Sequence, residues 1–219
     1  MKAKVNRVLI YCVGLLILAL GITLGTKAGL GVSPIISVAF IVSENTGVDL
    51  GNATFVLYSA FVAGEFLLRG RNSRWYDILQ LPLSLVFTRF LNIYGHFITY
   101  DSANHGLFEN LLILALGISL NGLGTCLAMN MRTILNPGEG IVQALIDRTG
   151  WRKGFAKNFV DTSCVCATVV IGLVCFGNIK GIHIGTLLAM IFIGRAVALS
   201  DRLLKDRICA AAGLKEIAP

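Results

Sequence analysis

The chain has 219 residues, of which 55% are hydrophobic and only 14% are charged, and its formal net charge is +7. A soluble domain carries roughly 25% charged residues, so this composition excludes an ordinary water-soluble protein. It also argues against a nucleic-acid-binding module, which gathers its positive charge on one soluble face.

Six apolar stretches follow one another along the chain, and each approaches or exceeds the ~20 residues that a helix needs to cross the hydrocarbon core of a membrane. They lie at about 8–26, 52–68, 77–98, 107–128, 158–176 and 182–199. We do not expect the first to be a cleaved signal peptide, since five more apolar stretches follow and no small-residue cleavage site is evident. The sequence therefore predicts an all-α membrane protein with six transmembrane helices.

The basic residues indicate how these helices are oriented. Lysine and arginine gather before the first stretch and at 69–74, 148–157 and 202–207. Loops on the cytoplasmic side of a membrane carry an excess of these residues, so we predict that all four clusters, and with them both termini, are cytoplasmic. The connections at 44–51, 100–109 and 177–183 hold acidic residues or little charge, and we expect them outside.

The sequence repeats itself. Residues 15–24 read LLILALGITL and residues 111–120 read LLILALGISL, so the two segments differ only at Thr23 and Ser119. The match continues: Pro34, Gly47 and Gly51 have the same spacing as Pro137, Gly150 and Gly154 without a gap, and Arg89 falls on Arg195 when residues 78–90 are laid on residues 184–196. Internal repeats reveal the architecture of a chain. We predict a single membrane domain built from two repeats, residues 1–100 and 101–219.

Each half also holds one short segment, from Pro34 to about Thr46 and from Pro137 to about Thr149. A helix of that length reaches only ~20 Å, too little to cross a membrane comfortably. We predict two re-entrant half-helices; an amphipathic helix lying flat on the membrane is the alternative for each. Three spans per half then give the halves opposite orientation, as in the inverted repeats of many transporters.

Both short segments begin with an N-cap residue followed by proline at the first helical position. The pairs are Ser33 with Pro34 and Asn136 with Pro137, and Glu139 is placed to close a capping box. If the two N-termini meet inside the membrane, their unpaired N–H groups and partial positive charge form a site for an anion or a carbonyl oxygen. In the alternative, the N–H groups are capped internally and the arrangement serves packing.

Four cations extend this prediction. Arg89 and Arg195 lie deep in the third span of each half, and Lys27 and Arg132 lie on the stretches before the half-helices. A charge inside a membrane normally faces protein, water or a partner, so we expect a positive centre, unless Arg195 snorkels to the surface and Lys27 is simply exposed. Asp161 is the candidate for pairing a cation or carrying a proton. The predicted solute-binding residues are Lys27, Gly31, Ser33, Arg89, Arg132, Asn136, Gly138, Glu139, Asp161 and Arg195.

Other kinds of site are not indicated. The six cysteines and three histidines do not have the spacing of a zinc site or a disulfide framework. The sequence shows no Ser/His/Asp set, phosphate-binding loop or paired catalytic carboxylates. We therefore expect no metal, no cofactor and no enzymatic activity.

Four segments, AGLGVSPIISVAF, NPGEGIVQALIDRTG, FAKNFVDTSCV and GIHIGTLLAMIFIGRAV, resemble the bacterial YitT/YczE-like integral membrane proteins. The similarity covers both halves and nearly the whole chain. It implies a multi-pass protein of the bacterial plasma (inner) membrane and names no substrate.

The leading hypothesis for function is a transporter or channel for a small, anionic solute bound at the half-helix N-termini. The alternatives are a substrate-binding membrane subunit of a larger transport complex and a scaffold or sensor that transports nothing. The expected partners are the solute and the lipid bilayer, without nucleic acid, and a homodimer is left open.

Overall fold

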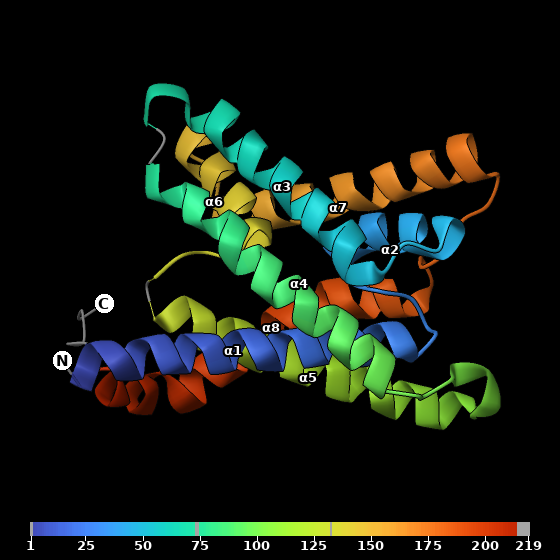
Figure 1. Ribbon diagram of the computed structural model, residues 1–219, viewed down its shortest axis with the longest axis horizontal. Helices are drawn as coiled ribbons and strands as arrows, with labels where there is room; N and C mark the ends of the chain where they lie inside the picture. The colour runs from blue at the N-terminus through green and yellow to red at the C-terminus, as the bar shows by residue number, and fades with distance from the viewer. Residues whose placement is uncertain (1, 73–74, 132, 214–219) are drawn as a thin grey trace.

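The computed structural model describes residues 2–72, 75–131 and 133–213, and within these ranges the chain is helical without any β-strand (Figure 1). The long helices are α1 (Lys2–Lys27), α3 (Leu50–Arg69), α4 (Gln80–Phe97), α5 (Leu107–Asn130), α7 (Lys153–Ile171) and α8 (Ile184–Ala211). Two helices are short, α2 (Pro34–Thr46) and α6 (Pro137–Thr149). Single turns form η1 (Gly70–Asn72), η2 (Trp75–Leu79), η3 (Ser102–Asn104) and the π-helical η4 (Gly172–Phe176).

Five helices in the described ranges are long and apolar enough to cross a membrane: Val5–Lys27, Leu50–Arg69, Leu107–Asn130, Lys153–Phe176 and Ile184–Ala211. They correspond to five of the six predicted spans. The remaining prediction, at 77–98, forms η2 and then the 18-residue helix α4. That helix does not belong to the apolar set, since Gln80, Arg89 and Asn92 interrupt its hydrophobic run.

The two short helices have the predicted bounds. Each has 13 residues, begins with proline and ends before a glycine in the left-handed conformation, at φ 74° for Gly47 and φ 72° for Gly150. A left-handed residue just beyond the last helical residue is a common helix terminator, and glycine adopts it without a steric cost. The start and stop signals in the sequence therefore determine these two helices.

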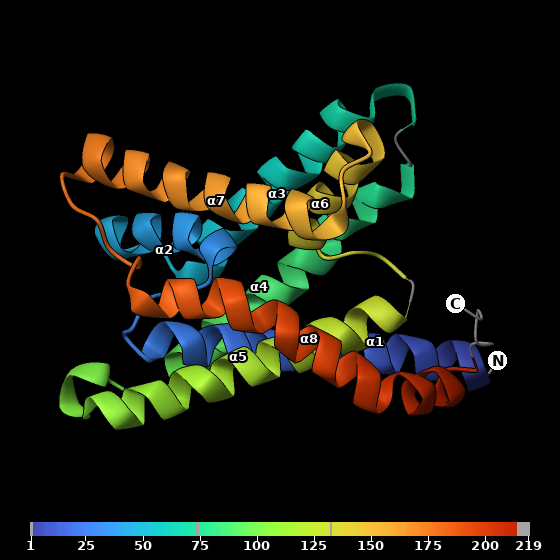
Figure 2. The same cartoon turned by 180° about the vertical axis from the view of Figure 1, so that it is seen from behind.

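The helices form two groups. In Figures 1 and 2, α1, α5 and α8 lie together on one side of the molecule and α3, α6 and α7 on the other. Helix α4 runs obliquely from one group to the other, and α2 lies between α7 and the first group. The largest core cluster joins Tyr11, Leu15 and Leu18 of α1 to Phe87 and Leu91 of α4.

Helices α1 and α5 run antiparallel with their backbones in direct contact. A Cβ atom added to Gly21 would lie 2.5 Å from the Asn121 backbone nitrogen, and one added to Gly124 would lie 2.4 Å from the Leu18 backbone nitrogen. A Cβ on Gly14 would come within 3.0 Å of the Gly124 carbonyl oxygen. Small residues at a crossing let membrane helices approach closely. The crossing therefore excludes any side chain at these glycines.

We expect Gly21→Ala to destabilise the protein by about 1–3 kcal/mol, because the added methyl group must push the two backbones apart. Thermal denaturation of the purified protein in detergent measures the effect. The matched control is Gly25→Ala on the same helix, where a Cβ atom meets nothing within 4 Å; it should be neutral or stabilise α1 slightly. Equal melting temperatures for the two variants would contradict the close crossing.

Candidate functional site

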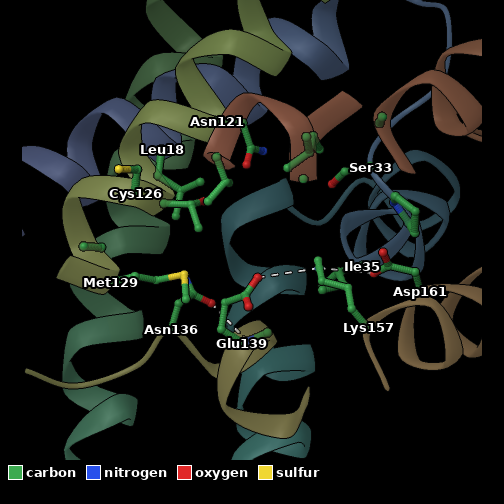
Figure 3. Close-up of a pocket in the computed structure, with 18 of the residues that line it drawn as sticks. Leu18, Ser33, Ile35, Asn121, Cys126, Met129, Asn136, Glu139, Lys157 and Asp161 are labelled. Atoms are coloured by element: carbon green, nitrogen blue, oxygen red, sulfur yellow. Dashed lines mark hydrogen bonds and ion pairs between the residues drawn. The ribbon is translucent and has the colours of Figure 1, made fainter. Parts of the chain in front are cut away.

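A cavity of about 640 Å³ opens between the two groups of helices. Its walls come from α1, α5 and α8 on one side and from α7 and the first turns of α2 and α6 on the other (Figure 3). Ligand pockets in proteins have volumes of roughly 300–1,000 Å³ and a few placed polar groups in an apolar lining. The polar groups here include Ser33, Asn121, Asn136, Glu139, Lys157 and Asp161.

The N-termini of α2 and α6 meet at this cavity. A Cβ atom on Gly138, the second residue of α6, would lie 3.2 Å from the side chain of Ile35, the second residue of α2. Ser33 and Asn136, the residues that precede the two helices, both line the cavity. The two half-helices predicted from the sequence therefore start side by side.

The two N-termini differ in how they are capped. The Asn136 side chain accepts a hydrogen bond from the Gly138 N–H at 3.0 Å. The backbone carbonyl oxygen of Asn136 accepts hydrogen bonds from the N–H groups of Glu139 and Gly140 at 2.8 Å each. Ser33 holds the N-cap position of α2 but makes no capping hydrogen bond with its side chain. The first amides of a helix have no acceptor within the helix. The first turn of α2 therefore lacks the side-chain acceptor that α6 has, and in this sense it is the more open of the two.

The predicted capping box at α6 is wrong in one respect. Asn136 is the N-cap, as predicted, but the Glu139 carboxylate lies against Lys157 of α7, 3.5 Å from its ammonium nitrogen. The same nitrogen lies 3.5 Å from a carboxylate oxygen of Asp161, one turn further along α7. A lysine available at ion-pair distance attracts the carboxylate away from the helix end, because charge-assisted contacts are the stronger kind.

Glu139, Lys157 and Asp161 form a charged triad in the cavity wall (Figure 3). The Asp161 side chain is 7% exposed, and those of Glu139 and Lys157 are 19% and 27% exposed. One positive charge between two carboxylates leaves an excess of one negative charge when all three are ionised. Asp161 was predicted as the candidate for pairing a cation, and the cation that lies at ion-pair distance from it is Lys157 rather than one of the four predicted cations.

Five of the ten predicted site residues line the cavity: Ser33, Asn136, Gly138, Glu139 and Asp161. Gly31 instead lines a neighbouring pocket of about 20 Å³. Lys27 is half-buried at the end of α1 and outside both linings. Arg132 falls outside the described residues.

Among the described residues, the cations of the predicted positive centre do not line the cavity. Arg89 is exposed, and its guanidinium donates to the Asn52 side-chain oxygen at 3.0 Å rather than to Asp161. Arg195 is exposed and lies over the ring of Phe192, 5.4 Å from its centroid. Helix α4 buries the face that carries Phe87 and leaves the face with Arg89 outside. Depth along a span therefore misled the prediction, because depth does not say which face a residue occupies.

Sequence reasoning missed several lining residues. Lys157 was assigned to a cytoplasmic basic cluster, although it precedes Asp161 by four residues, the spacing of helical ion pairs. Asp201 also lines the cavity and accepts a hydrogen bond from Asn130 at 2.7 Å. Tyr58, which is 3% exposed, lines it from α3. No group of three or more His, Cys, Asp or Glu side chains within the described ranges is placed to hold a metal ion.

We expect Lys157→Met to destabilise the protein by about 1–3 kcal/mol, since two partly buried carboxylates lose their cation. Adding Asp161→Asn should restore part of the loss, because it removes one of the two stranded charges. Arg89→Leu is the control: its bond to Asn52 is at an exposed position, and surface changes of this kind stay within about 0.5 kcal/mol. Melting temperatures of the purified variants in detergent measure these changes in stability. An equal fall in melting temperature for Lys157→Met and Arg89→Leu would refute the triad.

Comparison with known proteins agrees with a helical membrane protein. The curated protein named "Uncharacterized membrane protein YczE" from Bacillus subtilis (strain 168) is 23% identical over 192 residues, which cover 87% of this chain and 83% of that protein. No solved structure matches the chain. The family described as "Family of unknown function (DUF6198)" matches residues 5–202. The chain therefore belongs to this family of YczE-like membrane proteins.

Proposed function

We propose that the protein is a membrane transporter or channel for a small polar solute, which binds in the cavity between the N-termini of α2 and α6. The observation that carries this proposal is the meeting of two short-helix N-termini at a cavity that also holds the charged triad. Broken helices whose N-termini face a central site are the usual substrate-binding device of secondary transporters.

The proposal includes two inverted repeats. Helices α1 to α4 and α5 to α8 follow the same order of one long, one short and two long helices. The shift that carries Pro34 onto Pro137 also carries Ser37 onto Gly140 and Glu65 onto Thr168. Ser37 contacts Thr168, and Gly140 lies against Glu65. The contact between α2 and α7 thus has a counterpart between α6 and α3, which supports a pseudo-twofold relation.

The antiparallel crossing of α1 and α5 supports opposite orientation of the halves. In this proposal α4 is the sixth span and α2 and α6 are re-entrant. Two polar residues of α4 then keep partners within the protein, since Gln80 donates to Glu65 and Arg89 donates to Asn52, both on α3. Rocking of one half against the other would open the cavity to alternate sides of the membrane.

The cavity limits the class of solute. Three acidic side chains and two lysines line it, namely Glu139, Asp161, Asp201, Lys153 and Lys157. Lys27, Arg89 and Arg195, three of the four cations that favoured a simple anion, do not line it. The open first turn of α2 still favours an anionic or carbonyl group at Ser33, while the triad favours hydrogen-bond donors or a positive group opposite it. We infer a small solute with an anionic group and a second polar group, such as a zwitterion.

A thermal-shift experiment with chloride, nitrate, phosphate, acetate and glycine tests binding. A ligand at 100 times its Kd stabilises the folded state by about 2.7 kcal/mol, and we expect at least one probe to raise the melting temperature saturably. Ser33→Ala should weaken that effect. Ser43→Ala, which alters a serine in the last turn of the same helix, should not. If no probe binds and none crosses proteoliposome membranes, the transporter proposal fails.

We further infer that the protein lies in the bacterial plasma membrane with both termini cytoplasmic. In a variant without the six native cysteines, a cysteine at Asn104 should react with an impermeant reagent added outside the cell. A cysteine at Asn72 should react only after the membrane is made permeable. The reverse pattern would overturn the proposed orientation.

A further inference from the structure

Glu65 lies in α3 in a position that the cavity does not use. Its side chain is 1% exposed, and its Oε2 atom accepts a hydrogen bond from the Gln80 amide at 2.9 Å. Its Oε1 atom has no hydrogen-bond partner. A Cβ atom on Gly140 of α6 would lie only 2.2 Å from Oε1. A buried carboxylate oxygen is therefore in direct contact with the backbone of α6.

Glu65 shares one cation with two other carboxylates. The Arg69 guanidinium lies 2.5 Å from Asp77 and 3.3 Å from Asp147, whereas Glu65 is 3.7 Å away. The Asp77 and Asp147 side chains are 14% and 45% exposed, so Glu65 is both the most buried and the most distant of the three. Three carboxylates against one guanidinium leave two excess negative charges. Neutralising one carboxyl relieves this excess, and burial makes Glu65 the one to be neutralised.

The hydrogen bonds around Glu65 lead to the same conclusion. The Oε1 atom of Gln80, whose amide nitrogen donates to Glu65, is also buried and without a hydrogen-bond partner. Gln80 belongs to α4, which packs against α3. Buried oxygens normally find a donor, because leaving one unpaired costs free energy. A proton on Glu65 would turn one of its carboxylate oxygens into a donor.

We propose that Glu65 is a proton-binding site that is coupled to the cavity through α6. The carboxylate takes a proton from hydronium onto Oε1 and releases water, and deprotonation reverses the step without any other bond changing. The charged groups around Glu65 are Arg69 on its own helix and the two carboxylates that contact Arg69, Asp77 from η2 and Asp147 from α6. The assignment of this proton as the coupling ion rests on the proposed transport function, whereas proton binding itself does not.

The coupling follows from the sequence of α6. Gly140, which touches Glu65, is the residue after Glu139, whose carboxylate pairs with Lys157 in the cavity. A change of charge on Glu65 changes the contact between α3 and α6 and, with it, the placement of Glu139. The counterpart contact between α2 and α7 consists of the Ser37 and Thr168 hydroxyl groups, 2.7 Å apart and hydrogen-bonded to each other. That contact has no titratable group, so the proton site belongs to one half only.

Infrared spectroscopy of the purified protein tests proton binding without a solute. At neutral pH the wild type should show the C=O band of a buried protonated carboxyl group, with its deuterium shift in heavy water, and Glu65→Gln should lack it. Asp147→Asn should shrink the band at the same pH, because Arg69 then has fewer carboxylates to neutralise. Glu109→Gln, at an exposed site beside His105, should leave it unchanged. A band that survives in Glu65→Gln, or is absent from the wild type, would overturn the proposal.

Hydrogen exchange over residues 137–149 tests the coupling, with residues 34–46 as the internal reference. After correction for intrinsic rates, protection of this segment should change in the pH range where the wild-type band disappears, and should stay constant in Glu65→Gln. If protection in both proteins follows pH alike, α6 does not respond to Glu65. If sodium chloride but not choline chloride protects the wild type and not Glu65→Gln, a metal cation occupies the site and the proton proposal is wrong. None of these readouts needs a transported solute, so a failure here is distinct from a failure of the proposed transport function.

Discussion

The contact between α1 and α5 leaves no room for a side chain at its central glycines, and the placement of the cavity depends on it. Because the two helices run antiparallel, the segments that follow them, leading to Ser33 and Asn136, start from opposite ends of the pair. Both segments turn back toward the middle of the molecule, where α2 and α6 begin. A wider crossing would separate α1 from α5, and both helices line the cavity. The same crossing thus sets the stability of the fold and the width of the site.

The cavity exposes polar groups that lipid could not satisfy, because hydrocarbon offers no hydrogen-bond partners. A helix that starts inside a membrane protein exposes N–H groups, and an unpaired N–H group in an apolar medium is costly. At α6 the protein satisfies these groups itself, with the side chain and carbonyl of Asn136. At α2 the Ser33 side chain does not cap the helix, so the cost is left for water or a solute to offset. This difference between two otherwise similar helix ends supports the proposed binding role of the cavity.

Much of the fold could be predicted from the sequence, because its signals are local. Proline after an N-cap residue and a terminal glycine determined both ends of α2 and α6, and length with apolar composition identified five spans. The repeat in turn predicted that the two N-termini are a pair. Five of the ten predicted site residues line the cavity as a result. Several of these side chains lie at the N-termini of α2 and α6, so predicting where the two helices begin also placed these residues at the cavity.

The remaining site residues could not be predicted, for a reason of geometry. Depth along a helix is readable in a sequence, but the face that a residue occupies depends on packing by other helices. Arg89 and Arg195 were expected to be central cations from their positions along the helices, and yet they lie on exposed faces. Lys157 lies near the end of its span, where a cytoplasmic role was expected, and turns inward to Glu139 and Asp161. Tertiary contacts, rather than membrane depth, decide which cation serves the cavity.

The two halves carry their buried carboxyl groups at different positions of the proposed repeat. The shift that carries Ser33 onto Asn136 also carries Tyr58 onto Asp161, so one half has a phenol where the other half has the carboxyl partner of Lys157. The same shift carries Glu65 onto Thr168, with the charged group now in the first half. Each half therefore contributes one buried carboxylate, Asp161 facing the cavity and Glu65 behind α6. Two carboxylates at equivalent positions would repel across a symmetric core, whereas this alternation keeps them on different sides of α6 and leaves one of them free to change its charge.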